Sequence, residues 1–282
     1  MSGAVAAAPG GLRHHWRILR SAVAYEYKKA AAFKAGFIVR ELIHGIERPI
    51  IMIFVYKAIF VSSGAAAIGT YGEADLIAYM LLGATLWKLV FPERGLDLAE
   101  QIFEGFITKF LIMPLRFFLM MLGRFVQYSS LQLLIASTFW LLGLLIAPAI
   151  WPRPVSAVAV AQALTLVLLG SYCYFLLIVV LNTMAFWLDV VWTLLVMVRF
   201  IVGFCAGQLL PLALMPGFLK TTLPWFFPYW MLCAPVEILL GRLGGADFQR
   251  GLLTLIAWTL ALQLLAAATW RRGLRRYTGV GQ

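Results

Sequence analysis

The sequence predicts an all-α integral membrane protein with one transmembrane domain of six helices. Of its 282 residues, 63% are hydrophobic and only 12% are charged, whereas soluble domains are about 45–50% apolar and about 25% charged. The mean hydropathy is +0.91, and no stretch is rich enough in charge to cover a soluble domain. Most of the chain is therefore expected to lie in lipid.

Six apolar stretches approach or exceed the roughly 20 residues that a helix needs to cross a bilayer. The expected spans are residues 38–62, 76–90, 117–147, 155–181, 185–206 and 252–270. The transmembrane domain then covers residues 38–282, and residues 1–37 form an N-terminal tail with its own helix.

Lysine and arginine residues predict the orientation. Segments assigned to the cytosol hold sixteen of them, and the outer loops hold four. Because cytoplasmic loops carry the excess of Lys and Arg, both termini, including the tail 271–282, are expected in the cytosol. The net charge of +11 is thus a topology signal, and no nucleic-acid partner is expected.

Residues 12–28 predict an amphipathic helix. Leu12, Trp16 and Leu19 share one face, and Arg13 and Arg17 share the next. Such a helix lies on the inner leaflet and contacts membrane lipids. The alternative is a docking role for a protein partner.

The cytosolic loop 92–116 predicts a short helix with two faces. One face carries Asp97, Glu100, Glu104 and Thr108, and the other carries Leu98, Ile102 and Phe106. This helix can insert into a cleft of a cytosolic partner and pass the partner's motion to the spans. The alternative is a solvated connector.

Residues 207–241 are apolar but interrupted by Pro211, Pro216, Pro224 and Pro228. Each proline removes a backbone donor and breaks a helix. A single crossing here would also place the C-terminal arginines outside. The pattern therefore predicts a re-entrant pair of two short, broken helices that enters from the outer face.

Ionisable residues within spans normally face a bundle interior or water. Arg40, His44 and Glu47 share one side of the first span and predict a vestibule or lateral gate, unless this helix simply starts lower in the headgroups. Arg199 lies deep enough to need a partner, and its estimated depth favours Glu237. The full set of pathway or gate candidates is Arg40, His44, Glu47, Arg199, Pro211, Pro216, Pro228 and Glu237.

Catalytic motifs are missing from the sequence. There is no GxxxxGK[ST] phosphate loop and no HExxH zinc motif, and all three histidines lie near the N-terminus. The three cysteines lie in apolar surroundings and suit the core. We expect no catalytic residue, metal site or cofactor in this chain.

Four weak motifs in the same order resemble the permease subunits of type-2 ABC transporters, over roughly residues 25–280. The two-faced helix comes first, and Gly105 followed by Pro114-Leu115 resembles the family loop G-x-L-x-x-x-L-x-x-P-L, although Met113 stands where a basic residue is common. The proline-rich block 207–241 is similar to the family's outer re-entrant block. The ending WRRGLRRYTGVG resembles its cytosolic C-terminus.

The resemblance implies an ATP-driven exporter in which two permeases, identical or diverged, pair with separate ATPase subunits that bind ATP and Mg. It places the chain in the bacterial cytoplasmic (inner) membrane and assigns it a hydrophobic or amphipathic substrate, such as a lipid, glycan-lipid, drug or peptide. The helix in loop 92–116 becomes the coupling helix, and the block 207–241 becomes the outer gate. The residues assigned to ATPase contact are Asp97, Glu100, Ile102, Glu104, Gly105, Phe106 and Pro114.

Two other classes stay open from the residues alone. An ion-coupled secondary transporter needs an acidic residue near the membrane midplane and usually internal repeats, neither of which the sequence shows clearly. A polytopic membrane enzyme needs a catalytic constellation.

Overall fold

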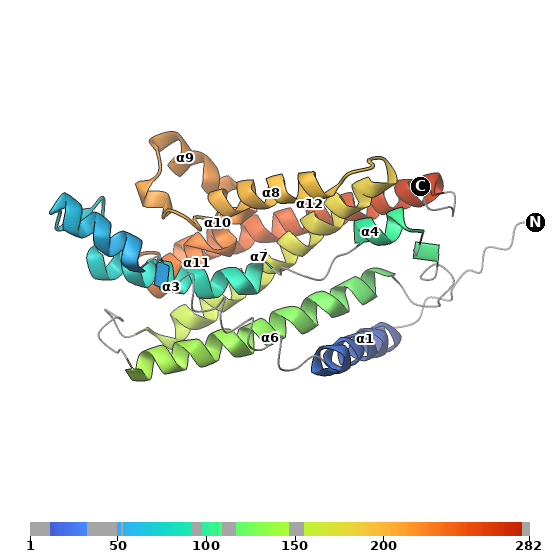
Figure 1. Cartoon of the computed structure of the whole chain (residues 1–282), viewed down its shortest axis with the longest axis horizontal. Coiled ribbons are helices and arrows are strands. Elements are labelled where there is room, and N and C mark those ends of the chain that lie inside the picture. The colour runs from blue at the N-terminus through green and yellow to red at the C-terminus, as the bar shows by residue number, and fades with distance from the viewer. Residues whose placement is uncertain are drawn as a thin grey trace, which may run out of the picture.

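Three long helices dominate the fold (Figure 1). The computed structural model describes residues 12–32, 50–51, 53–91, 98–105, 107–108, 117–146 and 155–277. The long helices are α6 (Phe117–Ile146), α7 (Ala157–Thr183) and α12 (Gly245–Arg276). Each contains a stretch that is long and apolar enough to cross a membrane.

Helices α7 and α12 pack extensively against each other. The hydroxyl of Tyr172 donates to the Gln263 side chain at 2.8 Å across this contact. Ser156 starts α7 by accepting a hydrogen bond from the Ala159 N–H at 3.1 Å. The Asp247 carboxylate accepts from the Gly244 N–H at 3.1 Å at the start of α12.

Shorter helices cover the other expected spans, with shifted boundaries. Of the expected first span, the described part contains the helix Ile53–Ser63. The second is α3 (Glu73–Val90), which packs against α6 and α7. The fifth is α8 (Trp192–Cys205), which begins later than expected because the short η2 (Met184–Phe186) and a turn precede it. A helix therefore occurs in each expected span, and the number of crossings stays a prediction.

The segment between the first two of these helices forms a small hairpin. Strands β1 (Ala67–Ile68) and β2 (Tyr71–Gly72) pair antiparallel, with Ala67 opposite Gly72 and Ile68 opposite Tyr71. The hairpin lies at the end of the molecule that also holds the proline-rich block, whereas the C-terminus lies at the other end (Figure 1).

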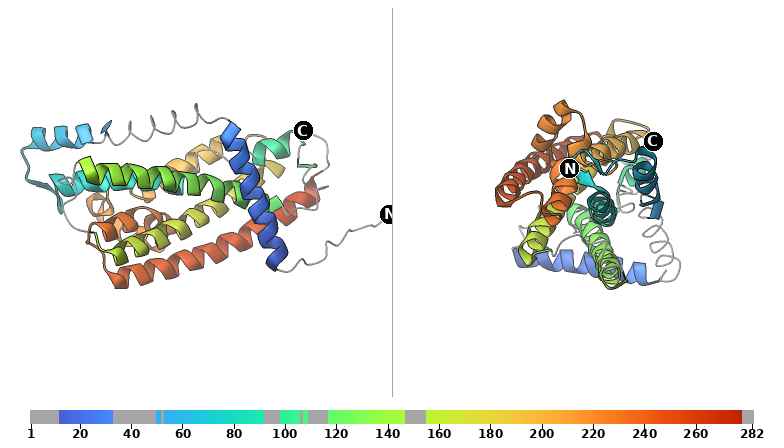
Figure 2. Two further views of the ribbon diagram at one scale, coloured as in Figure 1. Left: turned by 90° about the horizontal axis from the view of Figure 1, so that it is seen from below. Right: turned by 90° about the vertical axis from the view of Figure 1, so that its left-hand side faces the viewer.

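The N-terminal helix α1 (Leu12–Ala32) crosses the long helices at a steep angle, in dark blue in Figure 2. It packs on α6, and a Cβ at Gly123 would lie 2.8 Å from the Ala22 Cβ. An ion pair of 2.9 Å between Arg124 and Glu26 ties the two helices together. The helix expected over 12–28 is thus present, and its place at the lipid interface stays a prediction.

The proline-rich block is more finely broken than the expected pair of helices. It contains η3 (Leu212–Leu214), α9 (Gly217–Thr222), η4 (Leu223–Trp225), α10 (Phe227–Met231) and α11 (Cys233–Leu239). Residues 227–240 are all buried, and both α10 and α11 pack on α7. The prediction of two short helices was wrong in their number, because nearly every proline begins or interrupts a separate short helix.

Candidate functional site

Two opposite ends of the molecule hold the residues that the sequence singled out. At one end lies α4 (Leu98–Phe103), near the C-terminus, and at the other lie the hairpin and the proline-rich block (Figure 1).

Helix α4 has the two faces that the sequence predicts. Leu98 is fully buried and Ile102 is 5% exposed, whereas Glu100 and Glu104 are exposed. The helix ends at Phe103 and gives way to a turn at Glu104 and Gly105, where Gly105 adopts a φ of +75°, a conformation that glycine adopts without steric cost. Ile102, expected among the ATPase contacts, instead faces the bundle.

A side chain from another helix caps α4. The Asn182 side-chain oxygen, near the end of α7, accepts a hydrogen bond from the Ala99 N–H at 3.1 Å. The Asn182 side-chain nitrogen donates to the Ile178 carbonyl at 2.8 Å, which fixes the amide orientation. The first N–H groups of a helix lack partners within the helix, so Asn182 both stabilises α4 and attaches it to α7.

Tyr277 attaches the other side of the loop to the end of α12. Its hydroxyl donates to the Gly105 carbonyl at 3.0 Å and lies 2.9 Å from the Thr108 hydroxyl. Its ring meets the Phe186 ring edge-on, with centroids 6.1 Å apart. Gly273 makes room for Phe186, because a Cβ at Gly273 would lie 2.1 Å from a ring carbon. The loop after α4 is thus bonded directly to the C-terminal end of α12.

These two attachments join α4 and the loop after it to two of the three long helices, α7 and α12. Asn182 belongs to α7, Tyr277 directly follows α12, and the two helices pack together. Helix α4 and the loop after it are therefore bonded to both long helices. Other candidates for this end and for the first span lie outside the described residues: Asp97, Phe106, Pro114, Arg40, His44 and Glu47.

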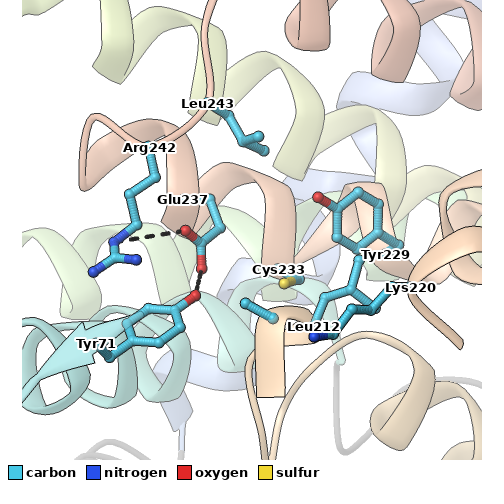
Figure 3. Close-up of a pocket in the computed structure, with 9 residues that line it drawn as sticks. Tyr71, Leu212, Lys220, Tyr229, Cys233, Glu237, Arg242 and Leu243 are labelled. Atoms are coloured by element: carbon cyan, nitrogen blue, oxygen red, sulfur yellow. Dashed lines mark hydrogen bonds and ion pairs between the residues drawn. The ribbon is translucent and has the colours of Figure 1, made fainter. Parts of the chain in front are cut away.

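A compact charged cluster occupies the opposite end (Figure 3). Glu237 of α11 is buried and accepts a hydrogen bond from the Tyr71 hydroxyl of β2. The Arg242 guanidinium lies 4.0 Å from the second Glu237 oxygen, 2.7 Å from the Asp75 carboxylate and 3.9 Å from the centre of the Tyr71 ring. Glu237 and Arg242 thereby fasten the hairpin, through Tyr71, and the start of α3, through Asp75, to the block.

Burial and the hydrogen bond to the Glu237 carboxylate together raise the pKa of Tyr71. A neutral phenol keeps its proton and can go on donating to the carboxylate. The contact between hairpin and block is therefore insensitive to pH on the tyrosine side.

The cation beside Glu237 is Arg242, not the expected Arg199. Gly241 has a φ of +71°, and this turn lets the Arg242 N–H donate to the Glu237 carbonyl at 2.9 Å. The guanidinium is thereby brought back over the end of α11. The predicted pairing of Arg199 with Glu237 was wrong. It rested on estimated depth in the membrane alone, and two residues at the same depth can lie on different sides of the bundle. Arg199 lies on α8.

The three prolines among the gate candidates lie at breaks in the block. Pro211 precedes η3 and is buried, Pro216 precedes α9 and is exposed, and Pro228 occupies the first turn of α10 and is buried. Proline suits these positions because the first N–H groups of a helix have no partner to lose.

A cavity of about 280 Å³ lies between the charged cluster and the block (Figure 3). Its polar lining consists of Tyr71, Lys220, Tyr229, Cys233, Glu237 and Arg242. Within the described ranges, no group of three or more His, Cys, Asp and Glu side chains could hold a metal ion.

Comparison with known families identifies the class of protein to which this chain belongs. The model of a family described as ABC-2 family transporter protein matches residues 48–281. The chain belongs to the ABC-2 transporter family. Searches of curated proteins and of solved structures find no significant match.

This ABC-2 permease is therefore a multi-pass membrane protein and a transport component rather than a catalyst. The match includes α4, the charged cluster and the end of α12, so both ends described above belong to the family region. The resemblance stated from the sequence motifs is confirmed.

Sequence reasoning missed the role of Asn182 in the permease. An asparagine in an apolar helix gives a weak signal, because a polar residue at that position can also bond within its own helix. Tyr277 was easier to recognise as a candidate, since it lies in the C-terminal motif. Its hydrogen-bond partners are about 170 residues away in the sequence and could not be inferred.

Proposed function

We propose that this chain is the membrane-spanning permease of an ATP-driven exporter and that the exposed face of α4 docks on a separate ATPase subunit. Membership of the ABC-2 family supports a transporter subunit. The observation that carries the coupling proposal is the double attachment of α4, through Asn182 to α7 and through Tyr277 to α12.

The exposed groups of α4 suit a docking surface. Glu100 and Glu104 are exposed, and Phe103 is 39% exposed beside them. A large apolar side chain flanked by carboxylates fits a groove with an apolar floor and a basic rim. Closure of the ATPase dimer on ATP would move this surface, and the two attachments would pass the movement to α7 and α12, which shifts the permease between two states.

Two permeases, identical or diverged, would enclose the pathway, with ATP and Mg held only by the ATPase subunits. The proposed location is the bacterial inner membrane with both termini in the cytosol, as the distribution of Lys and Arg predicts. The proposed cargo is hydrophobic or amphipathic, and the charged cluster at the opposite end belongs to the outer gate.

Charge reversal on α4 tests the coupling. Glu100→Lys and Glu104→Lys, in the complex copurified with its ATPase, should abolish cargo-stimulated ATP hydrolysis while the permease still inserts. The matched control is Glu73→Lys, because Glu73 is also an exposed glutamate but lies at the start of α3, at the other end. Unchanged stimulation in both α4 variants would remove this surface from the mechanism.

Copurification tests the class of transporter. The permease extracted from its native membrane should bring down a subunit with a phosphate loop in equal amount. Its repeated absence, together with transport driven by an ion gradient alone, would instead favour a secondary transporter.

A further inference from the structure

The exposed side of α12 carries a regular stripe of side chains. Its members follow one another at intervals of seven, four, seven and four residues: Leu253, Leu260, Leu264, Arg271 and Arg275. This spacing repeats one position on the surface of a helix. The three leucines are 68%, 62% and 73% exposed, and both arginines are exposed. The stripe therefore lies on one face of α12 and changes from apolar to cationic along it.

This face points away from the rest of the protein. The buried residues of α12 recur on its opposite side, where the helix packs mainly on α7: Gly251, Leu255, Leu262, Ala266 and Gly273. Both views of Figure 2 show α12, in red, at the edge of the bundle. In a membrane, exposed leucines at such an edge would contact the acyl chains of lipids. The arginines in line with them would then face the same lipids.

The length of α12 places the first of these arginines at the level of the lipid headgroups. Arg271 lies 21 positions after Arg250, with no charged residue between them. At about 1.5 Å per residue this segment spans about 32 Å, close to the roughly 30 Å of the hydrocarbon core. Tryptophan, which is enriched at membrane interfaces, occurs at both levels. The Arg250 guanidinium lies 5.6 Å from the centre of the Trp225 ring, and Trp270 directly precedes Arg271.

The chemistry of the two arginines suits a phosphate group. Arg271 and Arg275 lie one turn apart, which places their Cβ atoms about 5–6 Å from each other. Neither forms an ion pair with any residue in the described part of the chain. A guanidinium can bind phosphate oxygens through two parallel hydrogen bonds. The phosphate of an anionic phospholipid has no ammonium group of its own, so the pair favours this class over zwitterionic phospholipids.

We propose that Arg271 and Arg275 bind the headgroup phosphate of an anionic phospholipid in the leaflet that surrounds this end of α12, with the acyl chains along the exposed leucines. The other two arginines here, Arg272 and Arg276, lie about 100° further round the helix and do not continue the stripe. The site is separate from the proposed docking of α4 on an ATPase. Binding needs no ATPase, and failure of this proposal would leave that one unchanged.

Lipid binding to the purified full chain in a neutral detergent tests this site. The probe is dioctanoyl phosphatidylglycerol, counted by native mass spectrometry over a titration, and dioctanoyl phosphatidylcholine is the zwitterionic comparison. Arg271→Gln and Arg275→Gln together should weaken binding of phosphatidylglycerol roughly thirtyfold, about fivefold for each arginine. They should leave the weaker binding of phosphatidylcholine unchanged. Arg271→Lys with Arg275→Lys should retain part of the binding, because lysine keeps the charge but loses the paired hydrogen bonds.

The neighbouring arginines supply a matched control. Arg272→Gln with Arg276→Gln removes the same charge from the same end of α12, but from a position off the stripe. This control should weaken binding far less than the change at Arg271 and Arg275. Equal losses in the two double variants would show general electrostatic attraction and overturn the site. Wild-type binding by the variant with both Arg271→Gln and Arg275→Gln would overturn it as well.

Other occupants of this face give different results. If Arg271→Gln with Arg275→Gln loses a partner permease or a copurified ATPase while its lipid binding is unchanged, the stripe is a protein contact and the proposal is wrong. Inorganic phosphate has the charge without the acyl chains. Weak competition by phosphate supports a lipid ligand, whereas phosphate that binds as tightly as the lipid would overturn the role of the leucines.

Discussion

The hydroxyl of Tyr277 can be removed without removing its ring. Tyr277→Phe deletes the hydrogen bonds to Gly105 and Thr108 and keeps the ring contact with Phe186. A typical hydrogen bond contributes about 0.5–1.5 kcal/mol net. The site is only partly buried, so water can replace part of what is lost. We expect Tyr277→Phe to destabilise the attached state of the loop by about 1–2 kcal/mol. This lowers the equilibrium ratio of attached to detached loop by a factor of about 5–30.

A detached loop should uncouple the transporter rather than unfold it. In the complex with its ATPase, Tyr277→Phe should keep basal ATP hydrolysis and lose most of the cargo-stimulated part, and transport per ATP should fall with it. Tyr56→Phe is the matched control, because it removes a hydroxyl that bonds the Leu209 carbonyl at 2.9 Å at the opposite end of the molecule. If Tyr277→Phe couples normally while Glu100→Lys does not, the attachment to α12 plays no part in coupling.

Three other substitutions test the packing behind both ends. Asn182→Ala should destabilise the first turn of α4 by about 1 kcal/mol and speed hydrogen exchange of the Ala99 amide, and unchanged exchange would refute the cap. Gly273→Val should force Phe186 out of place and lower the melting temperature of the purified chain by several degrees, with Phe186→Ala restoring part of the loss; a neutral Gly273→Val would contradict the close approach. Glu237→Gln should lower the melting temperature by less than Glu237→Leu, because the amide still accepts a hydrogen bond; the reverse order would count against the buried bond.

The helical arrangement was predictable because it follows from local patterns. Apolar runs of sufficient length located the helices, and the helical repeat of Leu98 and Ile102 identified the buried face of α4. Prolines correctly indicated a broken block. Their exact effect was not predictable, since it depends on packing between segments far apart in the sequence, as where α10 and α11 pack on α7.

The contacts that define both ends were not predictable from the sequence. Asn182 with Ala99 and Tyr277 with Gly105 join residues 83 and 172 positions apart, and no local pattern encodes such a pairing. The choice of Arg242 for Glu237 depends on a single turn at Gly241. Estimated depth in the membrane could not show that Arg242, rather than Arg199, lies beside Glu237.

The charged cluster at the hairpin has an evolutionary consequence. Arg242 serves Asp75 and Glu237 together, so its loss alone would leave two carboxylates without their cation, one of them buried. Substitutions at positions 75, 237 and 242 should therefore be inherited as sets rather than singly, and homologues that lack the arginine should also have replaced the acids. The residues at these three positions would then covary among homologues.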